Sequence, residues 1–95
     1  MDRIEQRIVE LIDRRRDDIV SFARDVFDHA ELGYKEFRTA ERFARALRAQ
    51  GIETHEGLAL TGVKGYLRQT GAAAAGPTVA LIGELDALRI PEHPH

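Results

Sequence analysis

The stretch that decides the fold class is "TVALIGELDALRIPEHPH", residues 78–95. It opens with Thr78 to Gly83, a run of small and apolar residues with no polar position facing either side of a strand. A strand that is apolar on both faces is typical of an α/β sheet covered by a layer on each side. The sequence therefore predicts the α/β class.

The residues before this stretch predict two helices. Apolar residues between Ile4 and Val26 recur at spacings of three, four and seven, which is one face of an α-helix. Gly33 fits the position just past the end of that helix. A second helix is predicted from Phe37 to Gln50, with Gly51 as its stop.

From Gly51 onward the hydrophobic period changes to that of strands. Residues 52–56 ("IETHE") form a short strand candidate, and residues 62–70 ("GVKGYLRQT") alternate as a half-buried strand does. Residues 71–77 ("GAAAAGP") predict a flexible loop. With the run at 78–83, the chain has two helices and about three strands, too few to cover both faces of a sheet. We expect residues 1–95 to be the N-terminal segment of a larger catalytic domain.

Composition narrows the class of protein. A chain of 95 residues with 43% hydrophobic residues forms at most one small domain. The 14 basic and 16 acidic residues give no electrostatic case for binding nucleic acid or an anionic membrane. There is no cysteine for a thiolate metal site. No apolar run approaches the roughly 20 residues that span a bilayer, and the N-terminus is charged from Asp2 onward. We expect a cytoplasmic protein.

Two carboxylates, Glu84 and Asp86, follow the strand candidate at 78–83. Side chains two apart on a strand point to the same face, and open α/β sheets bind ligands beyond the carboxyl ends of their strands. Neighbouring carboxylates repel each other unless a cation neutralises them, so a divalent metal would suit the pair. In the alternative, Asp86 caps a following turn and has a structural role. Spacing alone leaves both interpretations open.

The four histidines have local interpretations. His29 lies at a predicted helix end, where a cation suits the helix dipole, and His55 lies in an edge-strand candidate. His93 and His95 form a His-x-His pair that can bind metal, but they lie in a proline-punctuated stretch that favours a solvated loop.

Two stretches carry a resemblance to a known family. Residues 29–40 ("HAELGYKEFRTA") resemble the His-Pro-Glu-Leu-Gly-aromatic-Glu-Glu stretch of the aminoacylase/carboxypeptidase-like metallo-amidohydrolases. Residues 82–92 ("IGELDALRIPE") resemble the Gly-Glu-aromatic-Asp-Ala-Leu-Pro stretch of one branch, which includes p-aminobenzoyl-glutamate, hippurate and indoleacetyl-amino-acid hydrolases. The Thr-Gly lead into "TGVKGYL", residues 61–67, also fits. Ala30 and Arg89 each stand where the family has proline, and the second departure predicts a different turn.

The resemblance implies a larger catalytic domain with a mixed sheet, interrupted by a smaller dimerisation domain. It implies that metal-activated water cleaves an amide or related C–N bond of a small-molecule substrate, such as an N-acyl amino acid or an aryl amine. Asp86 matches the aspartate that orients the metal centre, and Glu84 stands where the acidic branch has glutamate. The divalent metal, zinc or manganese, would be held mainly by residues outside this chain, including a Cys-Gly-His stretch.

Two hypotheses about function follow. In the first, the chain is the N-terminal segment of such an amidohydrolase, its partner is the C-terminal remainder of the same enzyme, and the complete enzyme is a homo-oligomer. By itself the chain is then inactive. In the second, the chain is a small interaction protein without catalytic activity, and its apolar run at 78–83 completes the sheet of a partner by strand addition.

Overall fold

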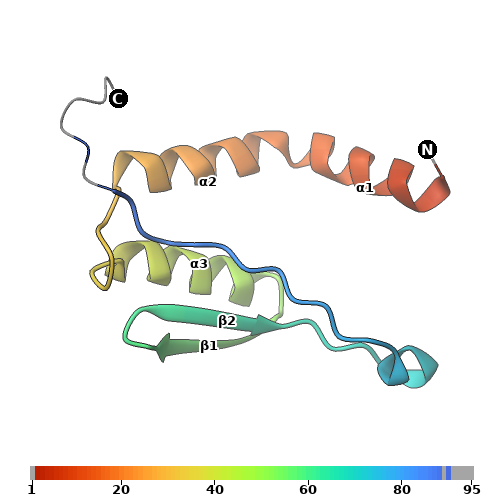
Figure 1. The fold of residues 1–95 in the computed structure, drawn as a ribbon. Helices are drawn as coiled ribbons and strands as arrows, with labels where there is room; N and C mark the ends of the chain where they lie inside the picture. The colour runs from red at the N-terminus through yellow and green to blue at the C-terminus, as the bar shows by residue number, and fades with distance from the viewer. Residues whose placement is uncertain (1, 89, 91–95) are drawn as a thin grey trace.

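The computed structural model describes residues 2–88 and residue 90. In this part of the chain, three helices precede an antiparallel hairpin and a short 3-10 helix (Figure 1). The elements are α1 (Arg3–Arg14), α2 (Arg16–Asp28), α3 (Phe37–Ala49), β1 (Glu53–Leu58), β2 (Gly62–Tyr66) and η1 (Gly71–Ala75). This mixture of helices and a small sheet confirms the predicted α/β class, in the form of part of a larger domain.

The single helix predicted from Ile4 to Val26 is two helices in the structure. Asp2 caps α1, because its carboxylate accepts a hydrogen bond from the Glu5 amide at 2.8 Å. The helical geometry breaks at Arg15, whose φ of −98° and ψ of 11° end α1 and begin α2. Neither helix contains a buried residue. None of the helices in residues 2–88 has the length and apolar character needed to cross a membrane.

Helix α3 packs against the hairpin and lies where it was predicted. Its buried small residues, Ala40 and Ala44, let the two strands approach closely. A Cβ added at Gly65 would lie 3.2 Å from the side chain of Leu47 in α3, so the strand passes this helix with little free space. Gly51 follows α3 with a φ of 74°, which confirms the predicted left-handed stop.

Strands β1 and β2 confirm the two strand candidates. Glu53 pairs with Tyr66 and His55 with Lys64, and the register shifts between His55 and Leu58. The loop predicted at 71–77 instead contains η1. The prediction that Gly33 ends the first helix is also wrong, because α2 ends at Asp28, ahead of Gly33 in the chain.

The strand predicted at residues 78–83 does not form. From the end of η1 to Leu88 the chain has neither helix nor strand, and it runs back across the molecule toward the loop between α2 and α3 (Figure 1). Val79, Leu81 and Ile82 are 82%, 100% and 92% exposed. The hairpin strands pair only with each other in the described residues, so this apolar run has no strand beside it.

The exposed apolar run predicts poor solution behaviour for the 95-residue chain. Burying a single Val, Leu or Ile side chain contributes about 1.5–3 kcal/mol, and several here contribute nothing. We expect self-association in sedimentation experiments, binding of a hydrophobic dye, and a broad thermal transition by circular dichroism. A monomer with a sharp two-state transition would contradict this expectation.

Candidate functional site

The loop after α2 and the segment before residue 88 meet in the structure, although they lie far apart in the sequence. The Ala87 amide donates a hydrogen bond to the Glu31 main-chain carbonyl at 2.7 Å. A Cβ added at Gly33 would lie 3.9 Å from Oδ2 of Asp86, so this carboxylate lies directly beside the glycine. The structure therefore brings together the two stretches that carried the family resemblance.

Glu31 caps α3 from outside the helix. Its Oε1 accepts hydrogen bonds from the Thr39 amide at 2.6 Å and from the Thr39 hydroxyl at 2.7 Å. Its Oε2 accepts a hydrogen bond from the Arg38 amide at 3.2 Å. The first amides of a helix have no partner within it, and an external carboxylate supplies one. Glu36, the residue at the N-cap position, makes no side-chain cap bond to the helix.

Glu36 instead holds the loop against the hairpin. It is buried, and its carboxylate accepts hydrogen bonds from the Tyr34 amide at 2.7 Å and from the Thr61 hydroxyl. Thr61, immediately before β2, is also buried. Tyr34 takes the left-handed conformation, with a φ of 61°, which turns the loop back toward Glu36.

Both glutamates have lowered pKa values. Burial opposes ionisation of Glu31, but hydrogen bonds from the Thr39 hydroxyl, the Thr39 amide and the Arg38 amide outweigh it and lower the pKa of Glu31. For Glu36 the Thr61 hydroxyl is the strongest influence and lowers the pKa, against burial and the nearby charge of Glu31. The loop beside Asp86 thus carries two ionised carboxylates at neutral pH, each held by hydrogen-bond donors.

The predicted site residues, Glu84 and Asp86, are both exposed. Among the described residues, none donates a hydrogen bond to either carboxylate. Asp86 lies against the loop at Gly33. The structure therefore places Asp86 beside the stretch at residues 29–40 that resembles the family's first motif.

This segment does not offer a closed metal site. Catalytic zinc takes three protein ligands, and structural zinc takes four. Over residues 2–88 and 90, no three side chains of the His, Cys, Asp or Glu type cluster closely enough to hold a metal ion. The donor set present, two exposed carboxylates, does not fit such a metal by itself.

The histidines that the structure describes have local partners. Nδ1 of His29 lies 2.9 Å from the Asp25 carbonyl, at the end of α2, which agrees with the predicted role at a helix end. His55 is exposed on β1, and its Nε2 lies 3.0 Å from the Glu53 carboxylate. Hydrogen bonds from Arg68 and His55 lower the pKa of Glu53 to about 2. Arg89, His93 and His95 lie outside the described residues.

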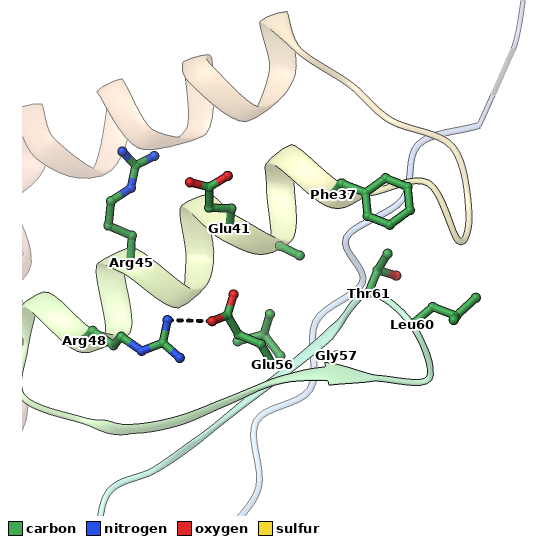
Figure 2. A pocket seen from close by; sticks show the side chains of 10 residues that line it. Phe37, Glu41, Arg45, Arg48, Glu56, Gly57, Leu60 and Thr61 are labelled. Carbon is green, nitrogen blue, oxygen red and sulfur yellow. Dashed lines mark hydrogen bonds and ion pairs between the residues drawn. The ribbon is translucent and has the colours of Figure 1, made fainter.

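A separate groove lies between α3 and the loop end of the hairpin, with a volume of about 610 Å³ (Figure 2). An ion pair between Arg48 and Glu56, 2.6 Å long, crosses it from α3 to β1. Phe37 and Thr61 line its other end. The groove includes neither Glu84 nor Asp86, so it is distinct from the predicted site.

The roles of Glu31 and Glu36 were missed at the sequence level. Both were noted only as part of a motif, and neither was assigned a contact. A signal was present, because acidic residues just before a helix often satisfy its free amides. The periodicity of α3 locates its start, but only the structure shows which loop carboxylate reaches it.

Comparison with known proteins gives several relatives and no match to a family model or to a solved structure. Thermostable carboxypeptidases 1 and 2 of Saccharolobus solfataricus are 38% and 40% identical to this chain over 76 and 75 residues, or 79% and 78% of the chain. IAA-amino acid hydrolase ILR1-like 2 of Arabidopsis thaliana is 36% identical over 74 residues, or 78% of the chain.

The aligned residues make up 19%, 18% and 16% of these three relatives, so the chain spans less than a fifth of their length. The relatives are named as hydrolases of two kinds, and both kinds fall within the family that the motifs at 29–40 and 82–92 resemble. The resemblance of the motifs to the aminoacylase/carboxypeptidase-like amidohydrolases is therefore confirmed by relatives that match 78–79% of this chain.

Proposed function

We propose that this chain is the N-terminal segment of a divalent-metal-dependent amidohydrolase. The complete enzyme cleaves an amide or related C–N bond in a small substrate of the N-acyl amino acid or aryl-amine type. The relatives support the hydrolase class by their names, a carboxypeptidase and an amino acid conjugate hydrolase. The substrate and the metal, zinc or manganese, are part of the proposal.

One observation carries this proposal in the structure. The two stretches that resemble the family's motifs meet through the hydrogen bond from the Ala87 amide to the Glu31 carbonyl, at 2.7 Å. This contact places the Asp86 carboxylate beside Gly33, on a loop that is held by hydrogen bonds to α3 and the hairpin. The contact supports the proposal because it brings together the two stretches that resemble the family's motifs.

In the proposed enzyme, Asp86 orients a metal ligand supplied by the remainder of the polypeptide. A carboxylate in this role fixes the direction of a ligand and raises its basicity. We further propose that Glu84 faces the same site in the complete enzyme. We propose that the group that moves the proton and most of the metal ligands belong to the remainder of the polypeptide. In line with this, the described residues hold no group of three or more His, Cys, Asp or Glu side chains that could hold a metal ion. The partner of this segment is therefore the rest of the same enzyme, which we propose to be a cytoplasmic homo-oligomer when complete.

A second candidate function rests on the exposed run at residues 78–83. Val79, Leu81 and Ile82 present apolar side chains on both sides of an unpaired stretch. Such a stretch can add as a strand to another sheet, which would make the chain an interaction protein without catalysis. Intact mass spectrometry of the native preparation distinguishes the two. A companion polypeptide containing a Cys-Gly-His stretch supports the enzyme, whereas a lone 95-residue chain supports the interaction protein.

The proposal predicts weak metal binding by the 95-residue chain. Two exposed carboxylates cannot form a site with three or four protein ligands. Calorimetric titration with zinc and with manganese should show no defined site of micromolar affinity. Tight binding at a single site, lost in Glu84→Gln or Asp86→Asn, would place the metal ligands in this segment and contradict the proposal.

A second prediction concerns Asp86→Asn in the complete enzyme. Asparagine keeps the size of the side chain but removes the charge that orients a metal ligand, so we expect turnover to fall by about 100-fold, at the upper end of effects at such positions. If Asp86 only capped a turn, asparagine would serve almost as well. Turnover is compared with that of His55→Ala, a change at an exposed histidine on β1 that should leave it unaltered.

The melting temperature separates the two roles of Asp86. An unchanged melting temperature together with the loss of turnover supports the role at the metal centre. Near-normal turnover of Asp86→Asn would remove this residue from the site.

A further inference from the structure

Glu31 forms hydrogen bonds at two ends, and they reach different parts of the chain. Its carboxylate accepts three hydrogen bonds from Arg38 and Thr39, at the start of α3. Its main-chain carbonyl accepts the hydrogen bond from the Ala87 amide. One residue thus joins the N-terminus of a helix to the segment that contains Asp86.

The carboxylate end is the more firmly held of the two. Thr39 is 1% exposed, and both its amide and its hydroxyl bind the same oxygen of Glu31. Hydrogen bonds to a charged acceptor are stronger than those between neutral groups. The position of the Glu31 backbone relative to α3 is therefore set by these contacts.

The carbonyl end holds a segment that has little else to hold it. Within the described part of the chain, residues 77–88 make one hydrogen bond to the rest of the protein, and it is the bond from Ala87 to Glu31. Val79, Leu81, Ile82 and Leu88 are all more than 80% exposed, and only Leu85 and Ala87 in the segment from Val79 to Leu88 are half-buried, so packing holds the segment at few points. The location of Asp86, next to Ala87 in the chain, depends on this contact.

Glu36 does not share this function, although it lies in the same loop. Its carboxylate binds the Tyr34 amide and the Thr61 hydroxyl, and neither belongs to the segment at 77–88. Glu36 fastens the loop to the hairpin, whereas Glu31 fastens the segment to the loop. The two carboxylates therefore have separable effects.

We infer that Glu31 is a positioning residue for Asp86. Its carboxylate anchors the loop to α3, and its carbonyl holds Ala87, so that the Asp86 carboxylate stays beside Gly33. This inference rests on the proposed function, because it gives Glu31 an effect on turnover only through Asp86. Loss of the Glu31 carboxylate would free the loop from α3 and release the segment that carries Asp86.

The test uses the complete enzyme that carries this segment, with Glu31→Ala as the main variant. We expect turnover to fall by about 10- to 100-fold, as for other residues that orient a metal ligand indirectly. Hydrogen exchange at the Ala87 amide, followed by mass spectrometry with residue resolution, should speed up by about two- to thirtyfold, the range that loss of a helix cap produces.

Asp2→Ala is the matched control, because Asp2 also caps a helix, at the Glu5 amide, and has no contact with the segment at 77–88. It should leave both turnover and exchange at Ala87 unchanged. Equal losses in both variants would mean that any lost cap harms the enzyme, and would overturn the inference.

A double-mutant cycle separates positioning from general stability. If Glu31 acts through Asp86, adding Glu31→Ala to Asp86→Asn should lower turnover by no more than about twofold further, because interacting residues are not additive. Additive losses would overturn the inference. If Glu31→Ala yields no folded enzyme, Glu31→Gln keeps the volume and one acceptor oxygen, and should show smaller losses in both readouts. Unchanged values in Glu31→Gln would then overturn it.

Failure of the proposed function gives a different pattern. Normal turnover in Asp86→Asn would contradict the proposed function, regardless of the results for Glu31→Ala. Faster exchange at Ala87 in Glu31→Ala would still show that Glu31 holds the segment in place. Normal exchange at Ala87 would overturn the inference even if the proposed function held.

Discussion

The hydrogen bonds between the Glu31 carboxylate and the first amides of α3 are the interaction on which this corner of the protein depends. A helix begins with amides that its own backbone cannot satisfy. Here the residue at the N-cap position, Glu36, is turned toward Thr61, so the need is met from five residues further back in the chain. The loop must fold over the helix end to do this, and Tyr34 takes a left-handed conformation in the process. The carbonyl of Glu31 is then presented to Ala87.

The parts of the fold that could be predicted from the sequence are those with a local cause. The apolar stripe from Phe37 to Gln50 and the stop at Gly51 define α3 because both act within a few residues. The hairpin follows from alternation on either side of a turn. The break at Arg15 was not predictable in this way. The helical spacing of apolar residues continues through Arg15, whereas the helical backbone geometry is interrupted there. The prediction of a strand at residues 78–83 was wrong for a further reason. A strand forms only beside another strand, and the composition of a segment does not show whether such a neighbour is present.

The site was only partly predictable. The position of Glu84 and Asp86 after an apolar run drew attention to them, and the resemblance to a family singled out Asp86. The contact of Asp86 with the loop at Gly33 could not be derived from the sequence. The two segments lie far apart in the chain, and no repeating pattern of residues indicates that they meet. Glu31 and Glu36 are both glutamates of the same loop. The carboxylate of Glu31 faces the start of α3, whereas that of Glu36 faces the hairpin. That difference is a property of the folded backbone.

The uncovered run at residues 78–83 also matters while the protein is being made. Chains emerge from the ribosome at about 5–20 residues per second, N-terminus first, and exposed apolar segments are prone to aggregate until their partners arrive. Here α3 and the hairpin can pack as soon as they emerge, whereas Val79, Leu81 and Ile82 stay in water. An extended apolar stretch of this kind is what holdase chaperones bind in unfolded chains. During synthesis, the residues most open to aggregation are therefore the few apolar ones next to the proposed site.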